Sequence, residues 1–85
     1  YKVGNVFSSD MFYDDADSGM LWTKMGVLGV EMEAAALYMN AARAGKKALA
    51  VLSVSDSFVH KEENLSGDER EKSFTDMMKV ALEIA

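Results

Sequence analysis

The chain contains no cysteine and no proline, and it has a single histidine. Without cysteine it can form neither a disulfide nor a thiolate metal site. The histidine, His60, lies in a charged loop, where we expect a solvated side chain and not a catalytic one. Neither a cluster of residues with metal-ligand spacing nor a glycine-rich phosphate loop is present. The sequence therefore predicts no metal site.

Positive charge and long apolar runs are also scarce. Basic residues number 9 against 14 acidic ones, and the formal net charge of −5 argues against binding to the phosphate backbone of nucleic acids. The longest apolar run, Ala48–Val54, is interrupted by Ser53 and is far too short to cross a bilayer. No cationic start followed by an apolar stretch indicates a signal peptide. We therefore expect a cytoplasmic protein that binds neither nucleic acid nor membrane.

The length of 85 residues allows at most one small domain with a modest core. The chain begins at Tyr1, directly in strand-like sequence, and ends at Ala85 inside a helical pattern without a glycine or proline stop. We expect it to be a piece of something longer.

The first half of the sequence alternates between strand and helix patterns, and a glycine closes each helix. The predicted elements are a strand to about Ser8, an acidic loop (Asp14–Gly19), a short helix (Met20–Gly26), a strand (Val27–Met32) and a helix from Glu33 or Ala34 to Ala44, with Gly45 as its C-cap glycine.

The second half begins with a nearly continuous apolar run, "KALAVLSVS", which suits a parallel strand buried on both faces. A loop over Asp56–Leu65 follows. Ser66 and Glu69 then have the capping-box spacing that starts a helix. One face of this last helix is apolar and consists of Phe74, Met77, Met78, Ala81 and Leu82.

Strands and helices in this order, with a buried central strand, predict an α/β layered fold. The helix ending at Ala44 should form a right-handed crossover between parallel strands. Ligands of such sheets bind beyond the carboxyl ends of the strands. This rule selects two places as candidate sites, Glu31–Glu33 and Ser55–Asp56.

Asp56 follows the predicted buried strand and opens a loop. Partial desolvation there would raise its pKa toward the range useful to a general acid. The alternative is an Asx-turn or capping residue that closes the strand, and the pattern alone favours this alternative.

Glu31 and Glu33 point to the same side if the strand continues through both. The two oxygens of one carboxylate can accept hydrogen bonds from the two hydroxyls of a sugar cis-diol. Alternatively, Glu33 complements the helix N-terminus and Glu31 pairs with a lysine, which explains one glutamate better than two. Met32 is the only methionine placed for a ligand, since packing explains the others.

Arg70 lies four residues before Phe74, at the head of the apolar face of the last helix. A cation in a first turn opposes the helix dipole, so this position suggests an anionic partner. The alternative is a side chain that covers apolar surface. Phe12 and Tyr13 follow the first strand, where they either stack on a flat ligand or fill the core.

Four stretches together resemble the C-terminal part of bacterial, hexameric-type purine nucleoside phosphorylases. They are "VGNVFSSDMFY", "GVLGVEMEAAALY", "ALAVLSVSD" and "EREKSFTDMMKVALE". The resemblance runs nearly from end to end of the chain. It implies the three-layer α/β/α nucleoside phosphorylase-like fold, with residues 1–85 as the C-terminal portion of a single domain.

The resemblance also implies an activity. The family converts purine nucleosides and deoxynucleosides, reversibly, to the free base and (deoxy)ribose 1-phosphate. Inorganic phosphate is the co-substrate, and no cofactor is needed. The resemblance also implies a homohexamer built from dimers, so self-association is expected.

The same resemblance assigns residues to the sugar and the base. Glu33 would hold the ribose 2′ and 3′ hydroxyls, with Met32 against the sugar. Glu31 would be a supporting residue at the edge of the sugar or a structural pair. Val30 and Phe12 would line the base.

At the base, the resemblance makes Asp56 the acid that protonates the purine N7 as the glycosidic bond breaks. Ser55 would neighbour the base. Arg70 would swing toward Asp56 when the site closes, which would make Asp56 a stronger acid at that moment.

The phosphate-binding arginines and the glycine-rich loop of the family would lie upstream of these residues. The chain has only two arginines, Arg43 and Arg70, so we expect the 85 residues alone to be inactive. Two alternatives remain open. One is a nucleosidase of the same superfamily that uses water in place of phosphate, and the other is a non-catalytic α/β fragment.

Overall fold

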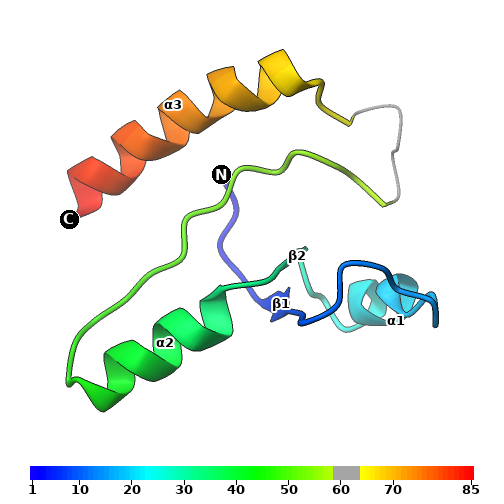
Figure 1. The fold of residues 1–85 in the computed structure, drawn as a ribbon, viewed down its shortest axis with the longest axis horizontal. Helices are drawn as coiled ribbons and strands as arrows, with labels where there is room; N and C mark the ends of the chain where they lie inside the picture. The colour runs from blue at the N-terminus through cyan, green and yellow to red at the C-terminus, as the bar shows by residue number, and fades with distance from the viewer. Residues whose placement is uncertain (59–63) are drawn as a thin grey trace. The chain divides into compact units, whose positions relative to one another are not determined.

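The computed structural model describes residues 1–58 and 64–85 (Figure 1). The chain divides into two compact units. The first unit is Tyr1–Leu49 and the second unit is Ala50–Ala85. His60 and part of the loop predicted at 56–65 lie outside the described residues. The elements are β1 (Val6–Ser8), α1 (Gly19–Lys24), β2 (Gly29–Glu31), α2 (Ala34–Arg43) and α3 (Gly67–Ile84).

β1 and β2 form a parallel two-stranded sheet in the first unit, visible beside α2 in Figure 1. Both strands are shorter than predicted, but each lies within its predicted range. The register places Ser8 opposite Glu31 at the carboxyl end of the pair. The connection between the strands contains α1, whose Trp22 stacks on Phe7 of β1 with 4.3 Å between the ring centroids.

Glycines end both helices of the first unit, as predicted. Gly26 and Gly45 follow α1 and α2 with φ angles of +79° and +65°, a left-handed conformation that costs glycine little. At the end of α2, the Gly45 N–H donates to the carbonyl of Ala42 (3.1 Å) and the Lys46 N–H donates to that of Ala41 (2.8 Å). These two bonds form a Schellman motif, which satisfies carbonyls that the helix leaves free.

α3 begins with the predicted capping box. The Ser66 hydroxyl accepts from the Glu69 N–H at 3.2 Å, and the Glu69 carboxylate accepts from the Ser66 N–H at 3.4 Å. The helix carries the predicted apolar face, but this face is largely open in the part of the chain that the structure describes. Phe74 is 37% exposed and Leu82 is 78% exposed.

The strand predicted from the apolar run "KALAVLSVS" is not formed, and this part of the prediction is wrong. Residues 46–57 belong to neither a helix nor a strand. A strand needs hydrogen bonds to a neighbouring strand, and β-favouring composition cannot supply that neighbour. The predicted crossover through α2 fails for the same reason. Among the described residues the parallel pair is β1 with β2, joined through α1.

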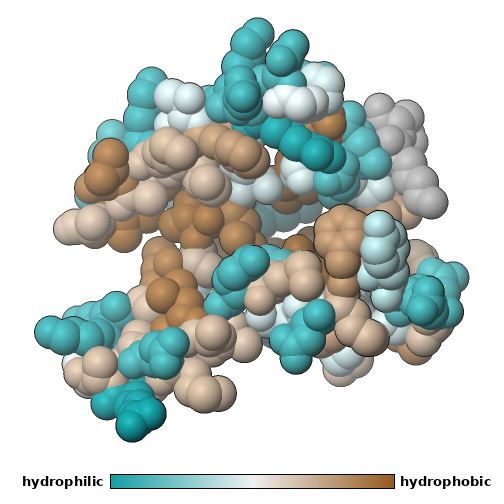
Figure 2. Space-filling view, viewed as in Figure 1, coloured by the Kyte–Doolittle hydropathy of each residue, from teal (hydrophilic) through white to brown (hydrophobic). Residues whose placement is uncertain are grey.

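Little of the described chain is buried. Ala34, at the start of α2, is the only described apolar residue that is buried, at 5% exposure. Apolar side chains are correspondingly visible on the face drawn in Figure 2. Among the described residues, no helix is both long enough and apolar enough to span a bilayer.

Candidate functional site

The turn between β2 and α2 carries the two glutamates of the first unit. β2 ends at Glu31, and Glu33 is already the N-cap of α2, with φ −125° and ψ −22°. The strand therefore does not continue through both glutamates, which was the condition for placing them on the same side. The backbone turns between them and gives the two side chains different surroundings.

Glu31 caps helix α2. Its Oε2 accepts from the N–H groups of Glu33 (2.7 Å) and Ala34 (2.5 Å). Burial raises the pKa of Glu31, but hydrogen bonds from Ala34, Glu33 and the Ser8 side chain outweigh burial and hold the pKa below its ordinary value. Complementing the helix N-terminus was the alternative role predicted for Glu33, whereas in the structure Glu31 has this role.

Glu33 lies exposed at the start of α2. The contact of its carboxylate in the structure is a long one, from the Met32 N–H to Oε2 at 3.3 Å. A carboxylate held this weakly can still accept hydrogen bonds from a ligand. This arrangement is compatible with the predicted sugar contact but does not test it.

The remaining predicted residues of the first unit are apolar and partly exposed. Val30 is 42% exposed and Met32 is 41% exposed. Phe12 is 79% exposed, and its ring meets the edge of Tyr13 with 5.1 Å between centroids. Their predicted roles at the base and the sugar remain predictions.

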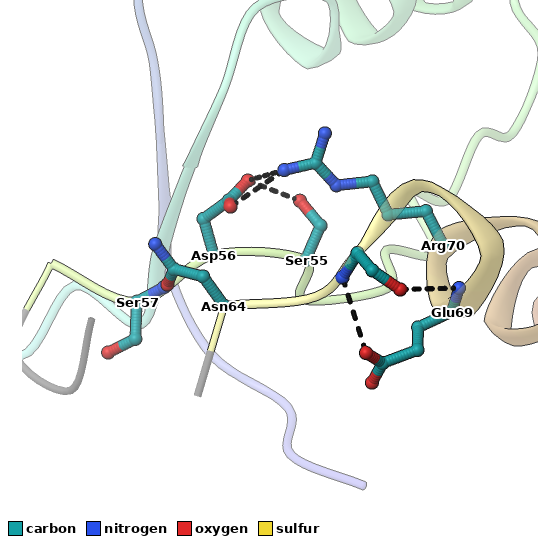
Figure 3. A network of polar contacts seen from close by, with 7 residues as sticks. Ser55, Asp56, Ser57, Asn64, Glu69 and Arg70 are labelled. Carbon is teal, nitrogen blue, oxygen red and sulfur yellow. Dashed lines mark hydrogen bonds and ion pairs between the residues drawn. The ribbon is translucent and has the colours of Figure 1, made fainter. Parts of the chain in front are cut away.

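Ser55, Asp56 and Arg70 meet in the second unit (Figure 3). One terminal nitrogen of Arg70 donates to both carboxylate oxygens of Asp56, at 2.8 and 3.0 Å. The Ser55 hydroxyl donates to Asp56 Oδ2 at 2.8 Å. The first turn of α3 thus places its arginine against an anionic partner, as the position of Arg70 suggested.

The pKa of Asp56 is lowered, where the sequence predicted a raised one. The hydrogen bond from Ser55 lowers it most, partial burial opposes this, and the hydrogen bond and positive charge of Arg70 lower it further. Desolvation does not dominate because the side chain is 42% exposed and no buried strand precedes it. With Arg70 in contact, Asp56 is a carboxylate that releases its proton readily.

Two further hydrogen bonds hold the chain on either side of Asp56. The Ser57 N–H donates to Asn64 Oδ1 at 2.6 Å, and the Leu65 N–H donates to the Ser55 carbonyl at 2.7 Å. Asn64 was not among the residues predicted for the site. An amide side chain just before a helix cap is a turn signal, and this signal could have drawn attention to it.

Ser8 was also missed. Its Oγ accepts from the Ala35 N–H at 3.2 Å, so the end of β1 is joined to the first turn of α2. The rule that selected Glu31, namely the carboxyl end of a parallel strand, applies equally to Ser8. Among the described residues, no group of three or more acidic or histidine side chains could hold a metal ion.

Comparison with known proteins places these residues in a family. The sequence profile of the phosphorylase superfamily matches residues 1–85. The chain belongs to the phosphorylase superfamily. Membership implies the α/β fold of that superfamily, and the helices and small parallel sheet described above agree with it.

Curated relatives identify the branch of the superfamily that the chain resembles. A protein of Clostridium novyi named "Purine nucleoside phosphorylase DeoD-type" is 56% identical over 85 residues, covering 99% of this chain and 36% of the relative. "Purine nucleoside phosphorylase DeoD-type 2" of Vibrio parahaemolyticus is 58% identical with the same coverage. The chain therefore spans 36% of the length of these relatives. The resemblance to bacterial purine nucleoside phosphorylases is confirmed. No solved structure matches the chain significantly.

Proposed function

We propose that these residues supply the base and ribose contacts of a purine nucleoside phosphorylase. The enzyme would reversibly convert purine nucleosides and deoxynucleosides to the free base and (deoxy)ribose 1-phosphate. Inorganic phosphate is the co-substrate and no cofactor takes part. The contact of Asp56 with Arg70, beside Ser55, is the observation that carries this proposal. The names of the relatives, at 52–58% identity, support it.

In the proposed reaction a phosphate oxygen forms a bond to C1′ of the ribose while the bond from C1′ to N9 breaks. The electron pair of that bond enters the purine, and N7 takes the proton of Asp56. A purine anion is a poor leaving group, so a proton donor at the base is needed. Arg70 lowers the pKa of Asp56. The ion pair of Asp56 with Arg70 therefore corresponds to the stage of the reaction after Asp56 has given its proton to N7.

The first unit would bind the nucleoside. The exposed carboxylate of Glu33 accepts hydrogen bonds from the ribose 2′ and 3′ hydroxyls in this proposal, and Met32 packs against the sugar. Val30 and Phe12 line the base, for which their exposed apolar surface is suited. Ser55 is also expected to neighbour the base, as the resemblance implies.

Architecture and assembly belong to the same proposal. We expect the three-layer α/β/α fold, of which residues 1–85 form the C-terminal portion of one domain. We also expect a cytoplasmic homohexamer built from dimers. Membership of the phosphorylase superfamily supports the α/β architecture, and the resemblance to hexameric-type purine nucleoside phosphorylases is the ground for the expected assembly.

The test uses a chimeric enzyme in which these 85 residues replace the matching part of the Clostridium novyi relative. We expect it to release hypoxanthine from inosine in phosphate buffer, and to form ribose 1-phosphate in equal amount. The unaltered relative is the control for expression and assembly. Base release without phosphate would favour a nucleosidase that uses water, and no release from any nucleoside would contradict the proposed function.

A further inference from the structure

The strand-to-helix turn is held by two side chains from different strands, and only one of them was singled out by the sequence. We propose that Ser8 is a positioning residue that acts with Glu31 to fix this turn and so to orient Glu33 toward the sugar. This inference rests on the proposed function, because it gives Glu33 a ribose to bind.

Three consecutive backbone N–H groups at the start of α2 donate hydrogen bonds to the side chains of Ser8 and Glu31. Glu31 Oε2 accepts from the N–H groups of Glu33 and Ala34, and Ser8 Oγ accepts from that of Ala35 at 3.2 Å. The first N–H groups of a helix have no partner within the helix. Two side chains therefore satisfy three of the N–H groups at the start of α2.

Ser8 and Glu31 also lie beside each other. They face one another in the register of β1 and β2, and the Ser8 side chain is among the groups that lower the pKa of Glu31. Ser8 Oγ itself accepts from the Ala35 N–H. Without the Ser8 hydroxyl, the first turn of α2 would lose its hydrogen bond to the end of β1, the strand that pairs with Glu31.

Glu31 and Glu33 consequently have different roles. Glu31 uses Oε2 for the helix, and its Oε1 is buried, so neither oxygen is presented to a sugar hydroxyl. Glu33 has its backbone N–H held by Glu31 and its carboxylate exposed. The geometry assigns Glu31 and Ser8 to orientation and leaves ribose contact to Glu33.

The experiment compares Ser8→Ala with Ser8→Thr in the chimeric enzyme, and Ser9→Ala is the matched control. Ser9 makes its side-chain hydrogen bonds to Met11 and not to α2. The measurement is the ratio of kcat/KM for inosine to kcat/KM for 2′-deoxyinosine. Losing a hydrogen bond of ordinary strength should lower this ratio roughly 2- to 10-fold in Ser8→Ala. Ser8→Thr keeps the hydroxyl and should restore the ratio, and Ser9→Ala should leave it unchanged.

A double-mutant cycle separates positioning from simple loss of stability. If Ser8 acts through Glu33, Ser8→Ala should have no further effect on the ratio when Glu33 is already alanine. Amide hydrogen exchange over residues 33–36 should quicken in Ser8→Ala but not in Ser9→Ala. Glu31→Gln, which keeps an acceptor oxygen but removes the charge, is a second variant and should lower the ratio in the same direction.

An active enzyme whose ratio is unmoved by both Ser8→Ala and Glu31→Gln would overturn the inference and leave the proposed function standing. Faster exchange with an unchanged ratio would also overturn it, because the contact would then be structural only. An additive loss in the double variant would show that Ser8 does not act through Glu33. A chimeric enzyme that releases no base from any nucleoside would overturn the proposed function itself, and the inference with it.

Discussion

At the scale of single residues, the three candidate acidic side chains differ in what they contact. Glu31 is engaged by backbone amides and Asp56 by Ser55 and Arg70, and both have lowered pKa values. Among the described residues, the Glu33 carboxylate has only a long contact, to the Met32 N–H. These contacts agree with the proposed roles, in which Glu31 is structural, Asp56 transfers a proton and Glu33 binds the ligand.

Asp56→Asn should lower turnover of inosine by the chimeric enzyme about 10²–10⁴-fold, because asparagine cannot supply the proton for N7. A nucleoside with a permanent positive charge at N7, such as 7-methylinosine, needs no such proton and should lose much less. Steady-state kinetics on both substrates is the measurement. Asp76→Asn, an exposed position on α3, is the matched control. Equal losses on the two substrates would show that Asp56 is not the proton donor.

Glu33→Ala should weaken discrimination between ribose and 2′-deoxyribose. Hydrogen bonds to a charged group are stronger than neutral ones, so kcat/KM for inosine should fall about 10- to 100-fold more than for 2′-deoxyinosine. Glu83→Ala, another exposed glutamate, should leave both values unchanged. Losses in the same ratio for both nucleosides would refute a contact between Glu33 and the 2′ hydroxyl.

At the scale of elements, the correct predictions were those that depend on signals within a few residues. The glycines after α1 and α2 and the capping box of α3 each specify a helix end through local backbone chemistry. The strand predicted at "KALAVLSVS" depended on partners elsewhere, and sequence composition contains no information on them. The candidate site shows the same difference between local and distant signals. Asp56 was selected because it follows a predicted strand, but its pKa is set by contacts with Ser55 and Arg70.

Two glycine substitutions at helix ends should change the stability of the chimeric enzyme in opposite directions. Gly45→Ala puts a side chain at φ +65°, where nothing lies within 4 Å, so the backbone conformation alone should destabilise the chimeric enzyme by about 1–2 kcal/mol. Gly67→Ala lies in the first turn of α3 and also in open space, and it should stabilise by about 0.4–1 kcal/mol. Thermal unfolding midpoints should fall for the first variant and rise for the second. A fall of the same size in both would contradict a cost specific to the left-handed conformation.

At the scale of the whole molecule, the described residues leave most of their apolar surface uncovered. Leu82 on α3 and Val54 in the extended segment are 78% and 76% exposed, and Tyr1 and Val3 lie fully at the surface. Exposed apolar side chains on this scale mark surfaces that other protein segments cover, or that aggregate when nothing covers them. The chain also spans 36% of the length of its relatives, so those proteins contain further residues that have no counterpart among these 85.

The 85-residue chain by itself should therefore be self-associated or aggregated, and it should not catalyse phosphorolysis. The apolar face of α3 and the open edges of the β1–β2 pair invite association. Neither Arg43, at the end of α2, nor Arg70, which is bound to Asp56, belongs to an evident phosphate site. The measurement is phosphate-dependent release of hypoxanthine from inosine by purified chain of confirmed mass, with its size determined by light scattering. The chimeric enzyme, assayed in parallel, shows that the substrate and the assay are sound. Turnover by the isolated chain near the ordinary enzyme median of roughly 10 s⁻¹ would refute this account, because a phosphate site would then have to lie within these residues.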